Sequence, residues 1–471
     1  MFGLKLKSLT KRILLGYFFY VVITGVVMFW LLQPTEVKVG STDDLSFRET
    51  DEKVASIDER DDAFKVRLDL IEAAEESLVM SYYAMQGGYT VDLFYDAILE
   101  AAERGVDVRF MIDGIFHNMR FQDRHIEHIF NEHPNIELAY YERFSFLKPW
   151  SWHNRLHDKF MIADEKKALI GGRNIGDKYF ADDGVMTVSN DRDLLIINPN
   201  NREPVIIRDM LNYFDYVYES DYVEVQSNSR LASINDRRAK RYKDDLKERT
   251  QQLKNEYNDF FEESIHWSDA ARPVKRAEFV HNSIDRFYKQ PHVLRRLLLQ
   301  AEKANDSLMV QTPYLIPTRP LKEKVEAMNI DQLNKAVLTN SLSATSNIMA
   351  HSGYRNHRKK LKNSDVTLYE YQGPDSSLHM KTWLFDQDVA AVGSFNGDAR
   401  STYLNTESML IIESPELVAD IHDYNHASYL SNSLTVDNRG KNEVREDESP
   451  LSKKVMTWLI RPIARGIAYL L

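Results

Sequence analysis

The sequence predicts an α/β protein made of two similar halves, preceded by a single transmembrane helix. Helix-like and strand-like patterns alternate from residue 63 onward, which is typical of a mostly or partly parallel sheet covered by helices. The same pattern, with the same short motif, returns about 230 residues later and indicates an internal duplication. A chain of 471 residues with 43% hydrophobic residues can bury the cores of two such halves.

An uncharged apolar run occupies residues 13–32. These twenty residues are enough for a helix that crosses a bilayer. Basic residues precede the run and acidic residues follow it: Lys5, Lys7, Lys11 and Arg12 before it, and Asp43, Asp44, Glu49, Asp51 and Glu52 after it. This asymmetry predicts a cytoplasmic N-terminus and an extracytoplasmic catalytic part. The alternative is a cleaved signal peptide, but the run is long and lacks an A-x-A-like site before Gln33.

We divide the chain into six expected segments. They are a cytoplasmic stub with the transmembrane helix (1–33), a linker (34–58), a first half (59–225), a charged helical connector (226–284), a second half (285–432), and a tail with a basic amphipathic membrane-surface helix (433–471). A coiled-coil interaction arm is the alternative for the connector, and a helix docked on the core is the alternative for the tail. Pro462 is expected to kink or restart the tail helix.

The elements of each half follow from hydrophobic periodicity and helix stop signals. The first half should contain a helix at 64–76, a strand at 77–83, a helix at 93–104 and a strand at 106–112, with Gly105 ending the second helix. The second half should contain a helix at 292–304 and strands at 307–314, 336–339 and 366–371. Strands 77–83 and 307–314 begin with similar residues, which supports the duplication.

Each half contains one copy of a short motif. The copies are His157-x-Lys159-x4-Asp164 and His379-x-Lys381-x4-Asp386, followed at equal spacing by Gly171 with Asn174 and by Gly393 with Asn396. Strand alternation places the histidine and lysine of each copy on one face, so both side chains can reach one pocket. One copy would be weak evidence for a functional site. The alternative is that both histidines are buried in the core and have only a structural role. Two copies with the same downstream context indicate a functional site.

These residue types suit metal-free chemistry on a phosphodiester. The two lysines supply positive charge, and Asn174, Asn396 and Ser394 supply hydrogen-bond donors for the anionic oxygens, while Gly172 allows close approach of the backbone. One histidine can attack phosphorus, and the other can protonate the departing alcohol and deprotonate the incoming one. The chain has no cysteine, and a lysine two residues from each histidine would repel a cation, so neither a metal nor a cofactor is expected.

The motifs resemble the HKD motifs of the phospholipase D superfamily, over roughly residues 60 to 430. Segments 171–180, 311–317, 352–361, 393–401 and 405–407 are similar to bacterial cardiolipin synthases, especially the branch related to the third enterobacterial type. The resemblance implies two pseudo-symmetric phospholipase D-like α/β/α sandwich halves that share one active site. It also implies transfer of a phosphatidyl group to phosphatidylglycerol, with phosphatidylethanolamine as a further candidate substrate.

The resemblance also implies roles for single residues. His157 would be the nucleophile and His379 the general acid and base. An acidic residue downstream of each motif would orient a histidine, often that of the opposite half, and the candidates are Asp193 (or Asp191) and Glu407. Asp164 and Asp386 would brace the turn after each motif rather than touch the substrate.

Other functions remain open from the sequence. The same site with water as acceptor would be a phospholipase D hydrolase, and a nuclease is disfavoured by the net charge of −11 and the anchor. A scaffold with a decayed site is disfavoured because both motifs are intact. Related synthases often have two N-terminal spans or none, and either arrangement leaves the catalytic part facing the cytoplasm. One span preceded by basic residues predicts the opposite side of the membrane. Tyr314, Trp383 and segment 146–152 are candidate walls of a lipid path, with core packing as the alternative for at least Tyr314 and Trp383. The sequence does not identify a protein partner.

Overall fold

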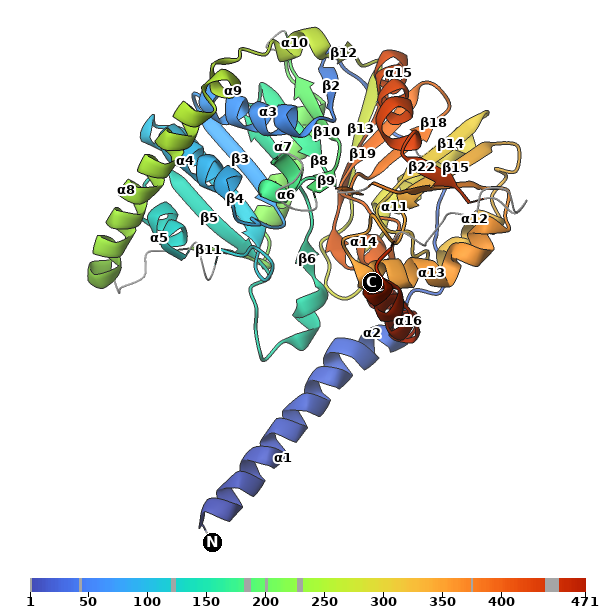
Figure 1. Cartoon of the computed structure of the whole chain (residues 1–471), viewed down its shortest axis with the longest axis horizontal. Coiled ribbons are helices and arrows are strands. Elements are labelled where there is room, and N and C mark those ends of the chain that lie inside the picture. Colours follow the sequence, from blue (N-terminus) through green and yellow to red (C-terminus); the bar gives the residue numbers. More distant parts are fainter. Residues whose placement is uncertain are drawn as a thin grey trace.

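The computed structural model describes residues 2–41, 45–119, 124–181, 188–199, 202–226, 232–373, 376–436 and 449–471, with the side chains of residues 2–8 and 232–236 left aside. Two α/β halves lie side by side, and a long helix projects from the body (Figure 1). Each half is built on one nine-stranded sheet, so the expected α/β architecture with two similar halves is confirmed.

The sheet of the first half has three central parallel strands, β3, β4 and β5, and antiparallel neighbours. Its order is β11 (Val223–Val225), β5 (Ile136–Tyr141), β4 (Asp107–Asp113), β3 (Ser77–Tyr82), β7 (Phe160–Ala163), β8 (Lys167–Gly171), β10 (Asp193–Ile197), β2 (Lys53–Ile57) and β12 (Arg272–Pro273). The helices of this half are α3 (Arg60–Ala73), α4 (Tyr89–Glu103), α5 (Arg124–Glu132), α6 (Asp177–Phe180), α7 (Ile206–Tyr218), α8 (Ala232–Glu256), α9 (Asn258–Glu262) and α10 (Trp267–Ala270).

The sheet of the second half repeats this arrangement strand for strand. Its order is β22 (Ser433–Thr435), β16 (Thr367–Tyr371), β15 (Asn334–Asn340), β14 (Ser307–Gln311), β18 (Thr382–Phe385), β19 (Val389–Gly393), β21 (Ser408–Glu413), β13 (Arg276–His281) and β1 (Arg48–Glu49). The helices are α11 (His292–Lys303), α12 (Arg319–Glu326), α13 (Ile348–Lys362), α14 (Ala399–Tyr403), α15 (Pro415–Tyr424) and α16 (Leu451–Gly466). The equal strand order gives the pair of halves pseudo-twofold symmetry.

The hydrophobic core has three main layers. One cluster fills the space between the first sheet and α3, α4 and α8, and another lies between the second sheet and α11. The third joins the inner faces of the two sheets, where β8 contacts β19 and β21. The halves therefore share one core, which holds the inner faces of the two sheets against each other.

The expected linker and connector both contribute strands to the sheets. Residues 34–58 include β1 and β2, and residues 226–284 include β12 and β13. The chain crosses between halves at each place, because β1 pairs with β13 of the second sheet and β12 pairs with β2 of the first. Helix α8 packs against α4 and α5, with Leu246 buried, so it is part of the first half rather than a free arm. The expected tail likewise begins with β22.

The projecting helix consists of α1 (Phe2–Val22), a π-helical turn (Ile23–Val27) and α2 (Met28–Leu31). Among the described helices, only the segment Leu9–Leu31 is long and apolar enough to cross a membrane. Its C-terminal end is fixed to the body by three hydrogen bonds to main-chain carbonyls: His153 to Gly25, Tyr469 to Val26 and Tyr288 to Phe29. A π-turn displaces carbonyls from the regular helical pattern, which makes such contacts possible. Asp43 and Asp44 lie outside the described residues.

Candidate active site

Two short parallel ladders bring the halves together at the motifs. In one ladder β6 (Arg155–Leu156) pairs with β20 (Asn405–Thr406), and in the other β9 (Val188–Asn190) pairs with β17 (Ser376–Leu378). The residues that follow these four strands are His157, Glu407, Asp191 and His379. Each ladder therefore places a histidine of one half beside an acid of the other half.

His157 is held by Glu407 of the second half. The imidazole Nδ1 lies 2.9 Å from Oε1 and 3.0 Å from Oε2 of the carboxyl group. Glu407 also accepts hydrogen bonds from the hydroxyl of Ser394 and from Nδ2 of Asn405 (3.2 Å). With Nδ1 engaged, Nε2 of His157 is the nitrogen left to meet a substrate, and the ring remains 12% exposed whereas Glu407 is fully buried.

His379 is held in the same way by Asp191 of the first half. Its Nδ1 lies 2.6 Å from Oδ2 of Asp191, and its backbone N–H donates to the carbonyl of Asn190 at 2.7 Å. The carboxyl group fits only because residue 172 is glycine: a Cβ there would lie 2.3 Å from Oδ1 of Asp191. Gly172 and Ser394 therefore each lie against one of the two acids, and their contact with a substrate stays a prediction.

Asp193 does not take the expected orienting position. It starts β10, where its carboxylate accepts from the guanidinium groups of Arg67 (2.9 Å) and Arg173 (2.8 Å), and all three side chains are buried. Strand alternation alone would put residues 191 and 193 on one face. Their surroundings differ because Asp191 lies in the short segment between β9 and β10, whereas Asp193 begins β10. The structure places the alternative candidate, Asp191, at the histidine.

The two lysines lie in the same buried region as the histidines. Lys159 and Lys381 donate hydrogen bonds to the carbonyls of His157 and His379, and Nζ of Lys381 lies 3.0 Å from Nδ1 of His379. Burial lowers the pKa of Lys159 to about 7 and that of Lys381 to about 8, although Glu407 and Asp191 favour the charged forms. Their charge is therefore poorly solvated, which favours a bound anion.

The electrostatic surroundings of the two histidine–acid pairs differ. Burial raises the pKa of Glu407 to about 7, although Lys159 opposes the rise. Burial also acts on Asp191, but Lys381 and the hydrogen bond from His379 outweigh it and hold its pKa below the usual value. Burial and the neighbouring lysines lower the pKa of His157 well below 6.5, and burial and Lys381 lower that of His379 to about 3. These shifts favour the neutral form of both imidazoles.

Asp164 and Asp386 brace the strands, as expected from the resemblance. Asp164 accepts hydrogen bonds from the backbone N–H groups of residues 75, 76 and 77, just before and at the start of β3. Asp386 accepts from residues 305, 306 and 307 at the start of β14. Both adopt positive φ, 53° and 52°, which fits a turn residue. Neither carboxylate is engaged with a histidine.

The two asparagines remain candidates for contact with a phosphate. The Oδ1 atoms of Asn174 and Asn396 are buried and have no hydrogen-bond partner among the described residues, and Nδ2 of Asn174 lies 3.0 Å from the hydroxyl of Tyr179. Rotation of the Asn174 amide would keep that contact and turn Nδ2 toward the open position. Within the described ranges no cluster of three or more histidine or acidic side chains could hold a metal ion.

Aromatic residues that we did not predict lie against both histidines. Tyr83 meets the ring of His157 edge-on at 5.1 Å, and Tyr179 meets that of His379 at 5.5 Å. Tyr83 directly follows β3, and Tyr179 follows Asn174 by five residues, so their positions in the sequence could have indicated them.

Tyr314, a predicted substrate contact, is held by other residues of the second half. Asn347 and Ser346 hydrogen-bond its side chain, and burial raises its pKa to about 12.

The predicted lipid-path residues lie in two different places. The carbonyls of Phe146 and Leu147 accept hydrogen bonds from Tyr17 and Tyr20 of α1, and both side chains are exposed. This part of segment 146–152 therefore runs along the apolar helix. Trp383 lies on β18 of the second half, away from that contact, and lines a separate apolar cavity.

Comparisons with known proteins agree with this geometry. The chain is 30% identical to Cardiolipin synthase C of Escherichia coli (strain K12) over 409 residues, 76% of this chain and 80% of that protein. It is 22% identical to Cardiolipin synthase 2 of Bacillus anthracis over 382 residues, 80% of this chain and 65% of that protein. The crystal structure of phosphatidylserine synthase from Haemophilus influenzae Rd KW20 has a TM-score of 0.65 at 13% identity, covering 91% of this chain and 98% of that one, which shows a common fold.

A family model covers both motifs. The family described as "Cardiolipin synthase, PLD-like domain" matches residues 68–217 and 297–427, which are more than half of the chain and lie one in each half. The match confirms the resemblance drawn from the motifs, and with the intact pairs of histidines and lysines it identifies the protein as an enzyme. The chain belongs to the phospholipase D superfamily, in the family of cardiolipin synthase PLD-like domains.

Proposed function

We propose that the protein is a membrane-bound phosphatidyltransferase of the cardiolipin synthase type, which transfers a phosphatidyl group to phosphatidylglycerol through a phosphohistidine. The observation that carries the proposal is the crossed pairing of His157 with Glu407 and of His379 with Asp191 around two buried lysines. The relatives named as cardiolipin synthases support the lipid class of the substrates.

In the first step, Nε2 of His157 attacks the phosphorus of the donor lipid. The bond from phosphorus to the headgroup oxygen breaks, and the departing alkoxide takes a proton from His379. In the second step, His379 takes the proton of the acceptor hydroxyl, whose oxygen attacks phosphorus and breaks the bond to nitrogen. Lys159 and Lys381 stabilise negative charge on the non-bridging oxygens in both steps.

The assignment of His157 as nucleophile rests on the unequal acids. A nucleophile must be a neutral imidazole, whereas a general acid must carry a proton that it can lose. Asp191 is the stronger acid of the two partners, so it is ionised and favours the imidazolium form of His379. Burial and the neighbouring lysines lower the pKa of both histidines, and the negative charge of a bound phosphodiester offsets the lysines and so acts in the same direction as Asp191.

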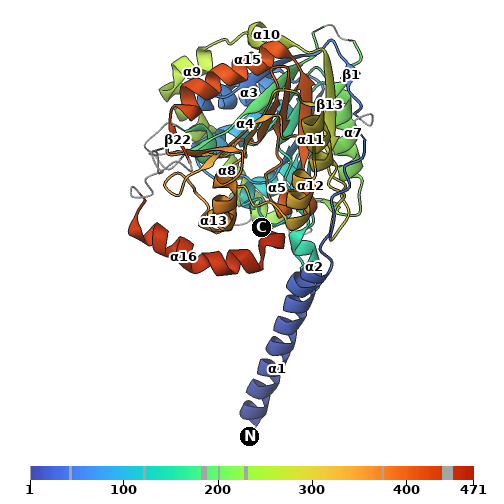
Figure 2. The ribbon, with the colours of Figure 1, turned by 90° about the vertical axis from the view of Figure 1, so that its right-hand side faces the viewer.

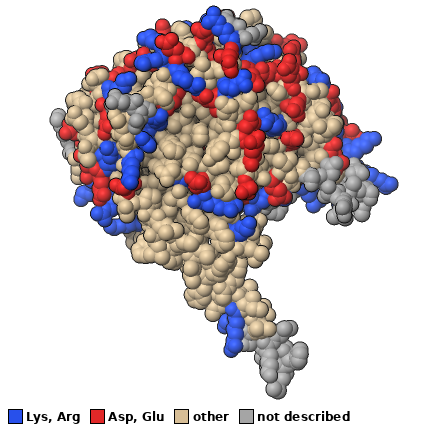
Figure 3. Space-filling model, turned by 180° about the vertical axis from the view of Figure 1, so that it is seen from behind, with Lys and Arg blue, Asp and Glu red and all other residues tan. Residues whose placement is uncertain are grey.

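We further propose that the body lies on the extracytoplasmic face, with α16 on the membrane surface. Helix α16 packs on α13 and runs along the underside of the body, with its C-terminal end near the upper end of the anchor helix (Figure 2). Its outward face is apolar and exposed: Leu451, Val455, Met456, Trp458, Leu459 and Ile463. On the face shown in Figure 3, the surface that tapers into the anchor is largely uncharged, whereas charged side chains gather at the top and along the sides of the body. Pro462 lies inside α16, which continues to Gly466.

The reaction is tested with purified protein in detergent and labelled phosphatidylglycerol, with and without phosphatidylethanolamine. Formation of labelled cardiolipin supports transfer, whereas phosphatidic acid as the sole labelled product would show a hydrolase and overturn the proposal. Topology is tested by adding protease to intact cells and following cleavage in segment 237–263. Cleavage supports the outward orientation, and protection that is lost on lysis would reject it.

A further inference from the structure

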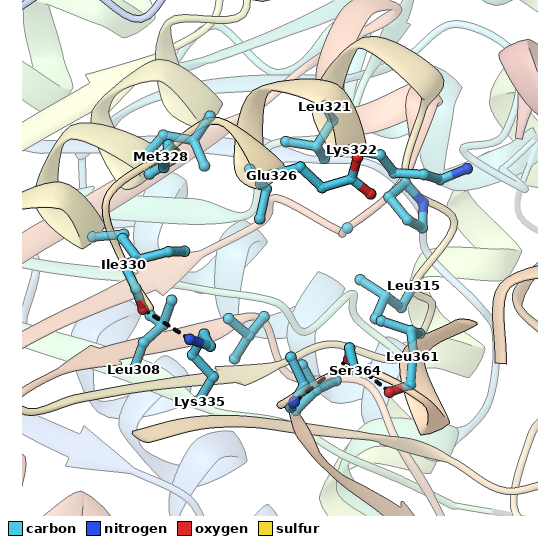
Figure 4. Close-up of a pocket in the computed structure, with 18 of the residues that line it drawn as sticks. Leu308, Leu315, Leu321, Lys322, Glu326, Met328, Ile330, Lys335, Leu361 and Ser364 are labelled. Carbon is cyan, nitrogen blue, oxygen red and sulfur yellow. Dashed lines mark hydrogen bonds between the residues drawn. The ribbon is translucent and has the colours of Figure 1, made fainter. Parts of the chain in front are cut away.

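The second half contains an apolar cavity that none of the reacting residues lines. It has a volume of about 420 Å³ and lies between the second sheet and helices α11, α12 and α13 (Figure 4). Its walls are mainly aliphatic, with Leu308 and Leu315 facing Leu321 and Met328 across the space. Cavities of about 300–1,000 Å³ are typical of ligand sites, and an apolar lining of this kind fits a hydrocarbon chain.

A second cavity, of about 530 Å³, opens beside the first at the level where the anchor helix ends. Gln33 and Pro34 at the end of the anchor contribute to it, together with α12, α13 and α16. Five of its lining residues carry or can take positive charge, and no acidic residue lines it: Arg319, Lys322, His357, Arg461 and Arg465. Such a basic lining at the edge of a membrane attracts anionic headgroups.

The two cavities adjoin each other, and two of the cations of the basic cavity form no ion pair among the described residues. Pro317, Lys322 and His357 line both cavities. Within the described part of the chain, neither Lys322 nor Arg465 forms an ion pair with an acidic side chain. Burial, and then Lys322 and Arg465, lower the pKa of His357 to about 4, which shows that positive charge gathers around this side chain.

We propose that the two adjoining cavities together hold one anionic glycerophospholipid of the membrane, with its phosphate in the basic cavity and an acyl chain in the apolar one. This lipid is distinct from the reacting lipids because its site contains neither histidine pair. It would, however, lie behind the segment that carries Asn396, since Phe395 and Gly397 line the apolar cavity and Ala399 and Tyr403 line the basic one. An occupied site would therefore support the wall of the active site.

The test uses the full-length His157→Ala variant, so that binding is measured without turnover. The protein is placed in phosphatidylcholine nanodiscs that contain a small fraction of phosphatidylglycerol with a photoactivatable group on its acyl chain, and labelled peptides are mapped after illumination. We expect label on β14, β18 and α13 at the cavity walls. Label confined to α1 and α16, which contact the bilayer in any case, would overturn the proposal.

Two variants separate the headgroup from the chain. Lys322→Gln with Arg465→Gln should reduce cavity labelling about thirtyfold at limiting probe, which is about 2 kcal/mol for two cations. Lys359→Gln with Lys362→Gln removes the same charge from α13 outside both cavities and should leave the labelling unchanged. Val325→Trp, at the partly open wall of the apolar cavity, should block the chain and reduce labelling as well.

The choice of lipid is tested with a phosphatidylcholine probe that carries the same photoactivatable chain. Weak cavity labelling by this probe supports recognition of an anionic lipid. Equal labelling by both probes would overturn the proposal, and so would full labelling of the Lys322→Gln Arg465→Gln variant with a normal melting temperature. None of these outcomes depends on which reaction the histidines catalyse.

Discussion

Replacing Asp191 with asparagine should abolish most turnover while leaving the protein folded. The side chain is fully buried, its Oδ2 lies 2.6 Å from Nδ1 of His379, and it is held ionised. Asparagine has the same shape but cannot stabilise an imidazolium or fix the tautomer as a carboxylate does. Loss of the corresponding acid in a serine protease triad costs about 10⁴-fold, and general acid–base catalysis contributes about 10²–10⁴-fold. We therefore expect kcat to fall about 10³–10⁴-fold.

Asp193→Asn is the matched control, two residues away and equally buried. It weakens the contacts with Arg67 and Arg173, and breaking a buried ion pair typically costs about 3–5 kcal/mol. Its effect should appear as a lower melting temperature, with kcat of the folded fraction close to that of the parent protein. Initial rates of cardiolipin formation and thermal unfolding are measured on the same preparations.

The reasoning would be refuted by the reverse pattern. If Asp191→Asn keeps more than about a tenth of the parent kcat, the acid does not take part in proton transfer on the scale of a general acid–base partner. If Asp193→Asn loses kcat to the same extent at an unchanged melting temperature, Asp193 rather than Asp191 would act on the reaction.

Four further outcomes follow from the geometry. Because the pKa of Lys381 is lowered to about 8 and that of Lys159 to about 7, kcat/KM should fall as pH rises through 7–8 and the cations are lost; a profile that is flat to pH 10 would contradict this. Asp164→Ala and Asp386→Ala each leave backbone N–H groups without their acceptor. Each should therefore lower the free energy of unfolding by roughly 1–3 kcal/mol, and with it the melting temperature, while kcat stays unchanged. A loss of kcat without destabilisation would instead indicate a direct role in the reaction. The fluorescence of Trp458, which is 71% exposed on α16, should be quenched by brominated phospholipids. Loss of this part of the quenching in Trp458→Phe would place α16 at the bilayer. Identical quenching in the variant would place α16 away from the bilayer. EDTA should leave the initial rate unchanged, and inhibition reversed by a divalent metal would contradict the proposed mechanism.

The motifs were predictable because their information is local. His157 and Lys159 lie two residues apart, so strand alternation alone puts them on one face, and the second copy repeats the spacing. The choice between Asp191 and Asp193 was not local. It depends on where β10 begins and on the pairing of β9 with β17, which joins residues nearly 190 positions apart.

Other features needed the tertiary structure for the same reason. Strand β1 has two residues, both exposed and charged, and it forms only because β13 of the other half offers an edge. Periodicity cannot reveal such a strand. The basic cavity also has no recognisable pattern in the sequence, since its cations come from α12, α13 and α16 and are up to about 150 residues apart. Neither feature has a contiguous pattern in the chain.

The two short ladders at the motifs have a consequence for how lipids reach the site. Each histidine and its acid follow directly on paired strands of two or three residues from different halves, so even a slight parting of the halves would separate both pairs at once. A slip of one residue in either ladder would turn the side chain to the opposite face. A clamshell opening of the two halves would therefore break both histidine–acid pairs. We expect substrates to enter while the halves stay closed, with any gating in loops such as segment 146–152, part of which runs beside the anchor helix.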